Sequence, residues 1–352
     1  MRFFQSATAL LAASGAALAA PLNKAKRTAS AADIQTLQFL HMMEEFEATY
    51  YLEGLSAFSA ADFSAAGWAI PDLVLENLLT FATDQSNHIQ FWGSVLESVG
   101  SQPISTCAFH FEPVLTDVAT WLQFGREMEY IGMGALMSAL TMLDSPEMLL
   151  DVTNIVTVEA RHQTLFNIFN GAEAVTQSYD AALTPSQLLA MAGQFITGCE
   201  IFPMDLPMVP QVTHLFAGMP AGLALNWTWG NATTQTVNAD AFWCQWTSGT
   251  ATDAVVQPIT QCVSPAINGY VFAWITNSST PLTTDITTQN VNNVVAGPAI
   301  AFVDSQKDIL SELAVTGTAD VNDINTISSA QAAALMGSSN GTMTTASGTV
   351  VA

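Results

Sequence analysis

A glutamate and a histidine stand three residues apart in the segment Val158-Glu159-Ala160-Arg161-His162. Residues at this spacing lie on one face of an α-helix, so the side chains of Glu159 and His162 point toward the same place. The imidazole can bind one metal ion, while the carboxylate can bind the same ion or bridge to a second. One such pair is weak evidence by itself, because its meaning depends on what the neighbouring helices contribute.

Three other predicted helices carry related residues near their middle. Glu44 and Glu47 occur in the first helix, Gln85 and His88 in the second, and Glu129 in the third. Dimetal carboxylate sites in four-helix bundles take one Glu from each of two helices and a Glu-x-x-His pair from each of the other two. The sequence follows this alternation, which predicts a site for two iron or manganese ions. The candidate metal ligands are Glu44, Glu47, Gln85, His88, Glu129, Glu159 and His162.

Gln85 departs from this pattern, because a glutamate is expected three residues before His88. A neutral amide oxygen binds a hard cation more weakly than a carboxylate does. The adjacent Asp84 is rotated by about 100° around the helix, so it could replace Gln85 only through a local distortion. A weakened site, a site for one ion and an empty site are all compatible with this sequence.

A network without metal is the alternative. Buried carboxylates are costly unless something compensates their charge. Arg126 lies one helical turn from Glu129 and could supply that compensation through ion pairs and hydrogen bonds. The sequence therefore leaves a metal site and a metal-free polar network open.

The elements that would position these residues are predicted from apolar residues that recur every three or four positions. Four long helices are expected at about 31–57, 71–100, 115–143 and 146–170, and a short fifth helix begins at Pro185 and ends by about residue 198. Proline near a helix start and glycine just beyond a helix end support these limits. We expect a four-helix bundle with a short fifth helix over residues 31–198.

The chain changes character from Cys199 onward. Short segments rich in β-branched and aromatic residues alternate with Asn, Gly, Pro, Ser and Thr, and they cover 223–229, 241–247, 269–276 and 294–303. This pattern predicts an all-β, sandwich-like domain over residues 199–310. Residues 311–352 are rich in Ser, Thr, Ala and Gly, which suggests a disordered or O-glycosylated tail. The expected fold class is thus α+β and multidomain.

The first residues have the layout of a secretory signal peptide. Arg2 precedes an apolar run that ends in Ala17-Leu18-Ala19, so residues 1–19 are the expected signal. Residues 20–27 end in Lys26-Arg27 and form either a pro-segment or a plain basic flank. We expect secretion, to the extracellular space or the cell wall. N-glycans are expected at some of the Asn-x-Ser/Thr sites, which lie at Asn226, Asn231, Asn277 and Asn340.

The charge balance excludes several function classes. The chain has 30 acidic and 7 basic residues among 352, and four of the basic ones lie within the first 27 positions. Such a surface repels nucleic acid and anionic lipids. No later segment is long and apolar enough for a membrane span. Hydrolase and phosphate-binding motifs of the G-x-S-x-G and glycine-rich-loop kinds do not occur.

Four cysteines in a secreted chain suggest two disulfides, which could be connected in three ways. We favour Cys244 with Cys262, which are close in sequence, and Cys107 with Cys199. No C-x-x-C pair occurs, so a thiolate zinc site is not expected.

Several of these segments resemble the secreted ferritin-like-domain proteins of fungi, a group that includes stress-response, desiccation-related and late-sexual-development proteins. The resemblance covers most of the mature chain and is strongest from about 31 to 175. It rests on Glu44–Tyr51, Asp84–His88, Glu129–Gly132, Val158–His162 and Ala296–Ala299.

The resemblance implies a ferritin-like bundle. It also implies that the metal ligands are Glu44 or Glu47, His88, Glu129, Glu159 and His162. The expected function is that of a stress- or development-associated protein, with a weakened non-haem dimetal site that acts on iron or reactive oxygen; as an enzyme it would be a dimetal oxidoreductase. The alternative is a non-enzymatic glycosylated wall or extracellular protein, which uses the bundle as a metal-free scaffold and the β-rich domain to contact a partner.

Overall fold

The computed structural model describes residues 29–104, 106–199, 218–229, 232–233, 241–249, 253–304 and 308–319, together with 328 and 330. The predicted signal peptide (1–19) and pro-segment (20–27), Asn231, Asn340 and most of the predicted tail lie outside these residues. Asn226 and Asn277 are both exposed, and their glycosylation stays a prediction.

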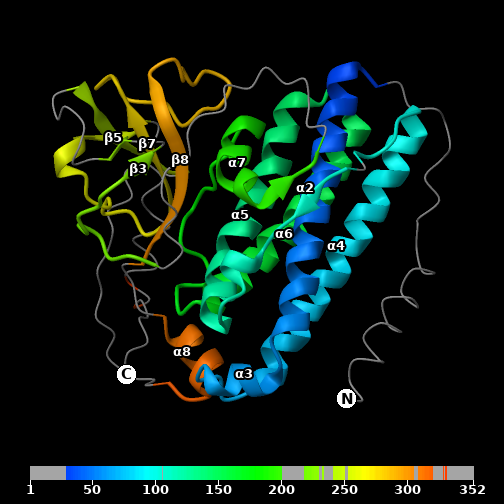
Figure 1. Cartoon of the computed structure of the whole chain (residues 1–352), viewed down its shortest axis with the longest axis vertical. Coiled ribbons are helices and arrows are strands. Elements are labelled where there is room, and N and C mark those ends of the chain that lie inside the picture. The colour runs from blue at the N-terminus through cyan, green and yellow to red at the C-terminus, as the bar shows by residue number, and fades with distance from the viewer. Residues whose placement is uncertain are drawn as a thin grey trace.

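Four long helices run side by side and form the bundle that the apolar periodicity predicts (Figure 1). Their bounds are Ala31–Ala57 (α2), Pro71–Val99 (α4), Val118–Met142 (α5) and Pro146–Phe169 (α6). The most extensive contacts within the bundle pair α2 with α4 and α5 with α6, and α2 also packs on α5. The short helix α3, Ala60–Ala65, lies between α2 and α4 in the chain.

Local sequence signals fix where these helices begin and end. Ser30 forms a capping box with Asp33 at the start of α2, which satisfies amide groups that have no partner within the helix. Pro71 occupies the first turn of α4, and Gly100 ends that helix with φ of 83°, a left-handed conformation that glycine adopts without a steric penalty. Asp117 caps α5 through the amide of Thr120 at 2.8 Å.

The connection between α4 and α5 crosses the bundle and is anchored on the segment after the fifth helix. Strand β1, Ala108–Phe109, pairs with strand β2, Ile196–Thr197, and the Cys107–Cys199 disulfide lies next to this ladder. A 3-10 turn, η1, follows at Glu112–Val114. The predicted fifth helix is present as α7, Pro185–Ala192, and it continues into a 3-10 turn, η2, at Gly193–Phe195.

A β-sheet region follows the helices, as predicted. Its main sheet is antiparallel, with strand order β6-β5-β7-β8, and the short pair β3-β4 lies apart from it. The bounds are Thr228–Trp229 (β3), Ala232–Thr233 (β4), Trp243–Thr247 (β5), Val255–Pro258 (β6), Gly269–Thr276 (β7) and Val294–Val303 (β8). The 3-10 turn η4, Ile259–Gln261, precedes Cys262, which is bonded to Cys244. Both predicted disulfides are therefore present.

The two faces of the main sheet are buried in different environments. Tyr270, Phe272 and Trp274 of β7 belong to the core that includes the helices, whereas the alternate residues Val271, Ala273 and Ile275 pack with Trp227 and the disulfide sulfurs. This alternation follows from the period of two in a strand. The sandwich-like packing that the sequence suggests thus takes the form, in the described residues, of one four-stranded sheet that packs on the bundle.

A further helix, α8, spans Ile309–Thr316. The predicted boundary between the β-rich domain and the tail, at residue 310, falls inside it. The hydroxyl of Ser311 donates to the carbonyl of Ala172, and the amide of Ala69 donates to the carbonyl of Val315 at 2.8 Å. Residues 311–316 are therefore part of the folded unit, because Ser311 is buried and Val315 packs against the core.

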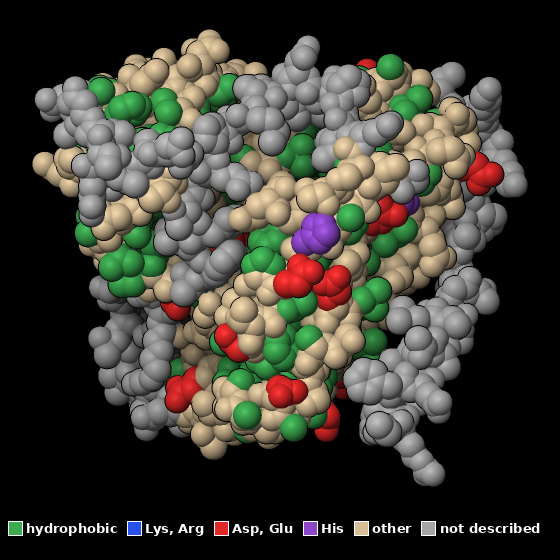
Figure 2. Space-filling model, viewed as in Figure 1, with side chains coloured by type: hydrophobic (Ala, Val, Ile, Leu, Met, Phe, Trp, Pro, Cys, Tyr) green, Lys and Arg blue, Asp and Glu red, His purple; other side chains and the backbone are tan. Residues whose placement is uncertain are grey.

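Charge and apolarity on the described surface agree with the composition. Acidic side chains are scattered over the face drawn in Figure 2, where no lysine or arginine is visible among the described residues. Within the same residues, no helix is both long enough and apolar enough to cross a membrane.

Candidate metal centre

The bundle brings all seven candidate ligands to one buried place. Each lies near the middle of its helix, on the face turned toward the other three helices, which is what the three- and four-residue spacing predicts. Apart from His88, whose side chain is 11 % exposed, every member of the set is almost fully buried. The set is Glu44 and Glu47 from α2, Gln85 and His88 from α4, Glu129 from α5, and Glu159 and His162 from α6.

Five of these residues form two groups that share Glu159. Glu44, His88 and Glu159 make one group, and Glu129, Glu159 and His162 make the other; within each, the possible ligand atoms all lie within 4.8 Å of one another. We call them the His88 half and the His162 half. The shared carboxylate stands where a bridging ligand is required in a two-ion site.

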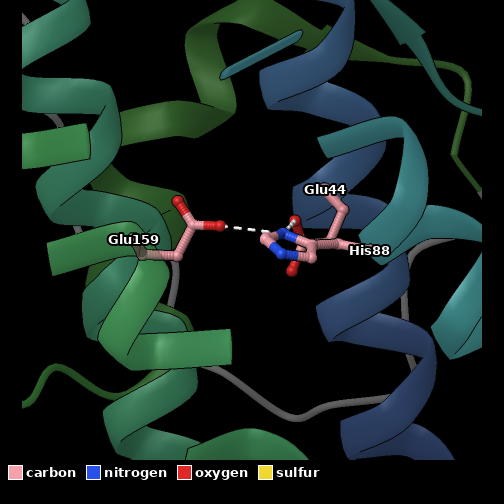
Figure 3. Close-up of side chains that lie close together, drawn as sticks. All are labelled: Glu44, His88 and Glu159. Atoms are coloured by element: carbon pink, nitrogen blue, oxygen red, sulfur yellow. Dashed lines mark hydrogen bonds and ion pairs between the residues drawn. The ribbon is translucent and has the colours of Figure 1, made fainter. Parts of the chain in front are cut away.

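In the His88 half, Nδ1 of His88 is surrounded by oxygen atoms. It lies 3.1 Å from Oε2 of Glu44 and 2.9 Å from Oε1 of Glu159. Figure 3 shows the imidazole of α4 between the carboxylates of α2 and α6. Gln85 joins the same group, because its Oε1 lies 3.1 Å from that nitrogen and its Nε2 donates to Oε2 of Glu159 at 3.1 Å.

In the His162 half, the imidazole contacts a carboxylate on the side that faces away from the centre. Nε2 of His162 lies 3.1 Å from Oδ2 of Asp84, while Nδ1 faces the centre at 3.3 Å from Glu159 and 3.6 Å from Glu129. A metal-binding histidine commonly donates its other ring N–H to a carboxylate, which fixes its tautomer. Asp84 therefore does not replace Gln85, as a distorted helix would have allowed; it supports His162.

Burial and the two imidazoles shift the acidities of the centre in opposite directions. Burial raises the pKa of Glu47 and of Glu129 well above the usual value for a glutamate, and it also raises that of Glu44. Burial acts in the same direction on Glu159, but His162 and His88 outweigh it and hold the pKa of Glu159 below its usual value. Without metal, the centre thus keeps its shared carboxylate ionised between two imidazoles.

Burial opposes the protonation of both histidines, but the carboxylates prevail. Glu44 and Glu159 raise the pKa of His88 to about 10. The charge of Glu129, together with the hydrogen bond that the ring donates to Asp84, raises the pKa of His162 to about 12. Metal binding would have to displace protons from these positions.

The donor set fits a divalent transition-metal ion. Carboxylates and imidazoles together suit iron and manganese, and buried polar atoms normally have partners. Within the described residues, Oε1 of Glu47, Oε2 of Glu129 and Nδ1 of His162 have no hydrogen-bond partner, and Oε1 of Glu159 has only its 2.9 Å contact with Nδ1 of His88. An ion held by Glu129, Glu159 and His162, whose possible ligand atoms lie within 4.8 Å of one another, would give the atoms of Glu129 and His162 a partner.

Arg126, the expected compensating cation, faces away from the centre. Its guanidinium carbon lies 3.9 Å from the ring centroid of Phe302 in β8. Burial lowers the pKa of Arg126, and Tyr270 and Asp304, which raise it, also lie on the side of the sheet. The metal-free alternative therefore depends on His88 and His162 for positive charge rather than on Arg126.

Sequence reasoning missed two side chains that hold the carboxylates. The hydroxyl of Tyr51 donates to Oε1 of Glu129, and the indole N–H of Trp92 donates to Oε1 of Glu44 at 3.2 Å. Each follows a candidate ligand of its own helix by four residues: Tyr51 follows Glu47, and Trp92 follows His88. The four-residue spacing places each aromatic residue on the same helix face as the candidate ligand. In the sequence, however, an aromatic residue on an apolar stripe looks the same as an ordinary core residue.

Comparison with known proteins agrees with this architecture. A family model described as a ferritin-like domain matches residues 32–172, which span α2 to α6. A search of curated proteins finds no match to the chain. The chain therefore contains a ferritin-like domain, followed by a β-sheet region.

Proposed function

We propose that this is a secreted protein whose ferritin-like domain binds iron or manganese and acts on iron or on reactive oxygen. The observation that carries the proposal is a set of three buried atoms on candidate ligands, in Glu47, Glu129 and His162, that have no hydrogen-bond partner within the described residues. Leaving a buried polar atom without a partner costs about 1–3 kcal/mol, and a transition-metal ion suits carboxylates and an imidazole together.

The bound ion would supply electron exchange with iron or reactive oxygen, and the residues of the chain define its surroundings. Glu159 lies between both imidazoles, Asp84 orients His162, and Tyr51 orients Glu129. The surrounding apolar helices exclude bulk water, which strengthens every electrostatic interaction inside the centre.

The biological setting is part of the proposal. A stress or developmental role, and membership of the secreted fungal group, rest on the sequence resemblance. Secretion rests on the signal-like leader. The two disulfides support an oxidising compartment.

The second candidate is a non-enzymatic glycosylated wall or extracellular protein that uses the bundle as a metal-free scaffold. One observation favours it: His88 makes close contacts with Glu44, Gln85 and Glu159 that require no ion. In this case the β-sheet region would contact the partner.

Metal analysis of protein purified from a secretory host separates the two candidates. The first predicts bound iron or manganese, and a melting temperature that a chelator lowers, because a ligand of the folded state stabilises it. A Glu97→Gln variant, at an exposed position of α4, should behave as wild type. Metal-free protein whose melting temperature is the same with chelator and with added Mn²⁺ would leave only the scaffold.

A further inference from the structure

The two halves of the centre differ in how fully their hydrogen bonds are satisfied. In the His88 half, both oxygens of Glu44 have donors, Trp92 on Oε1 and His88 on Oε2. Gln85 joins the remaining pair, because its amide group contacts Glu159 and His88 at 3.1 Å each. This half is a closed network.

The position of Nδ1 in His88 decides what that nitrogen can do. Three oxygens, from Glu44, Gln85 and Glu159, lie within 3.1 Å of it. A nitrogen placed among acceptors must carry a hydrogen, so its lone pair is not available to a metal ion. Binding an ion here would require this network to be broken.

The His162 half has the opposite arrangement. Nε2 of His162 lies 3.1 Å from Oδ2 of Asp84, and a neutral ring that donates this N–H directs the lone pair of Nδ1 at the centre. Among the described residues, that atom has no hydrogen-bond partner, and neither do Oε2 of Glu129 and Oε1 of Glu47. Of these three atoms, those of Glu129 and His162 belong to the His162 half, and none belongs to the His88 half.

Charge points to the same half. Glu129 and Glu159 lie beside His162, and Glu44 and the shared Glu159 lie beside His88. The carboxyl group of the buried Glu47 interacts more strongly with Glu159 and Glu129 than with Glu44. Where a third acid could stand, the chain has the neutral Gln85. A second divalent ion would also be repelled by the first across the shared carboxylate.

We infer that the centre binds one divalent transition-metal ion per chain, in the His162 half, while Gln85 keeps the His88 half closed as a hydrogen-bonded network. This inference rests on the proposed function. It assigns to Gln85 the role of limiting the centre to one ion.

Titration of chelator-stripped protein with Mn²⁺ tests the number of ions, with bound metal and electron paramagnetic resonance as readouts. Wild type should bind one Mn²⁺ per chain and give the six-line signal of an isolated ion. Gln85→Glu should bind a second ion and give the broadened signal of a coupled pair. The matched control is Gln90→Glu, the same substitution at an exposed position of α4, and it should stay at one ion.

Two further variants test the location of the ion. His162→Gln should lose Mn²⁺ binding, whereas His88→Gln should retain one ion with the isolated signal. The reverse result would overturn the assignment to the His162 half.

The outcomes separate this inference from the proposed function. Wild type that binds two Mn²⁺ ions and gives the coupled signal would overturn the inference while leaving metal binding intact. Wild type that binds none would overturn the proposed function and the inference with it. Because the wild-type stoichiometry is decisive by itself, the test does not depend on whether the buried Gln85→Glu variant folds.

Discussion

The carboxylate of Glu47 occupies the space that a side chain at Gly132 would fill. A Cβ atom at position 132 would lie 1.8 Å from Oε1 of Glu47, far inside van der Waals contact. Helix α5 can therefore approach this carboxylate of α2 only because residue 132 has no side chain. The Glu129-Tyr130-Ile131-Gly132 segment thus contributes one candidate ligand and, three residues later, the space for another candidate, Glu47.

Replacing Gly132 with alanine should disturb the centre directly. The added methyl group must displace Glu47, so we expect unfolding free energy to fall by about 1–3 kcal/mol, as for other overpacked sites, and Mn²⁺ to bind more weakly. Urea unfolding and metal titration measure the two effects. In the control, Gly93→Ala, the nearest atom is Nε2 of His41 at 3.8 Å, and alanine should stabilise the helix by about 0.5–1 kcal/mol. Equal behaviour of the two variants would contradict the role given to Gly132.

Glu159→Gln should abolish metal binding, because Glu159 belongs to both halves of the centre. The metal-free protein should also lose about 3–5 kcal/mol, the cost of removing one partner from a buried ion pair. Circular dichroism would show whether the helices persist, and metal analysis would follow on folded protein. Folded Glu159→Gln with a full complement of metal would show that the shared carboxylate is not a ligand.

Asp84→Asn should weaken metal binding by about 10–100-fold, the range typical for partners of metal-binding histidines. The side-chain amide of the variant is neutral, so its oxygen accepts the N–H of His162 more weakly than the carboxylate does. The imidazole is then oriented less firmly. Asp72→Asn, at an exposed position of the same helix, is the control. Identical dissociation constants for both variants would remove Asp84 from the support of the centre.

The stability of the metal-free protein should fall as pH rises. The pKa of His88 is raised to about 10 in the folded state, from 6.5. The stabilisation from its protonated form is therefore complete below pH 6.5 and is lost as pH rises towards 10. Glu47 and Glu129 act in the same direction, since their pKa values are also raised.

Melting temperatures in chelator, measured from pH 6.5 upward, test this dependence. They should decline, and the gain from added Mn²⁺ should widen with pH, because the ion and the proton compete. His88→Gln should flatten the decline, whereas His110→Gln, at an exposed position, should not. A melting temperature independent of pH over this range would contradict the charge assignment.

The helices and their inward faces were predictable because helical geometry fixes the direction of each side chain relative to its neighbours. Glu44, Glu129 and Glu159 each sit among apolar residues at three- and four-residue spacing, so their burial followed from the pattern. Strand β7 was predictable for a similar reason, since an aromatic and β-branched run bounded by turn residues favours a buried strand.

For Arg126 and Glu129, helical spacing does not predict which neighbouring element each side chain contacts. They are about 60° apart around α5, so a helical projection puts them on one stripe. In the folded chain Glu129 turns toward Tyr51 of α2, while Arg126 turns toward Phe302 of β8. Helix α5 contacts both the bundle and the sheet, and only the tertiary packing decides which of its residues contacts which neighbour.

The sequence by itself determined which residues are buried together in the bundle, because their spacing within each helix fixes the face they share. Only the tertiary structure decided the pairing of atoms across helices. It placed Asp84 behind His162, Gln85 between His88 and Glu159, and Gly132 against Glu47. These contacts depend on the distance and rotation between helices, which are set by the packing of residues far apart in the chain.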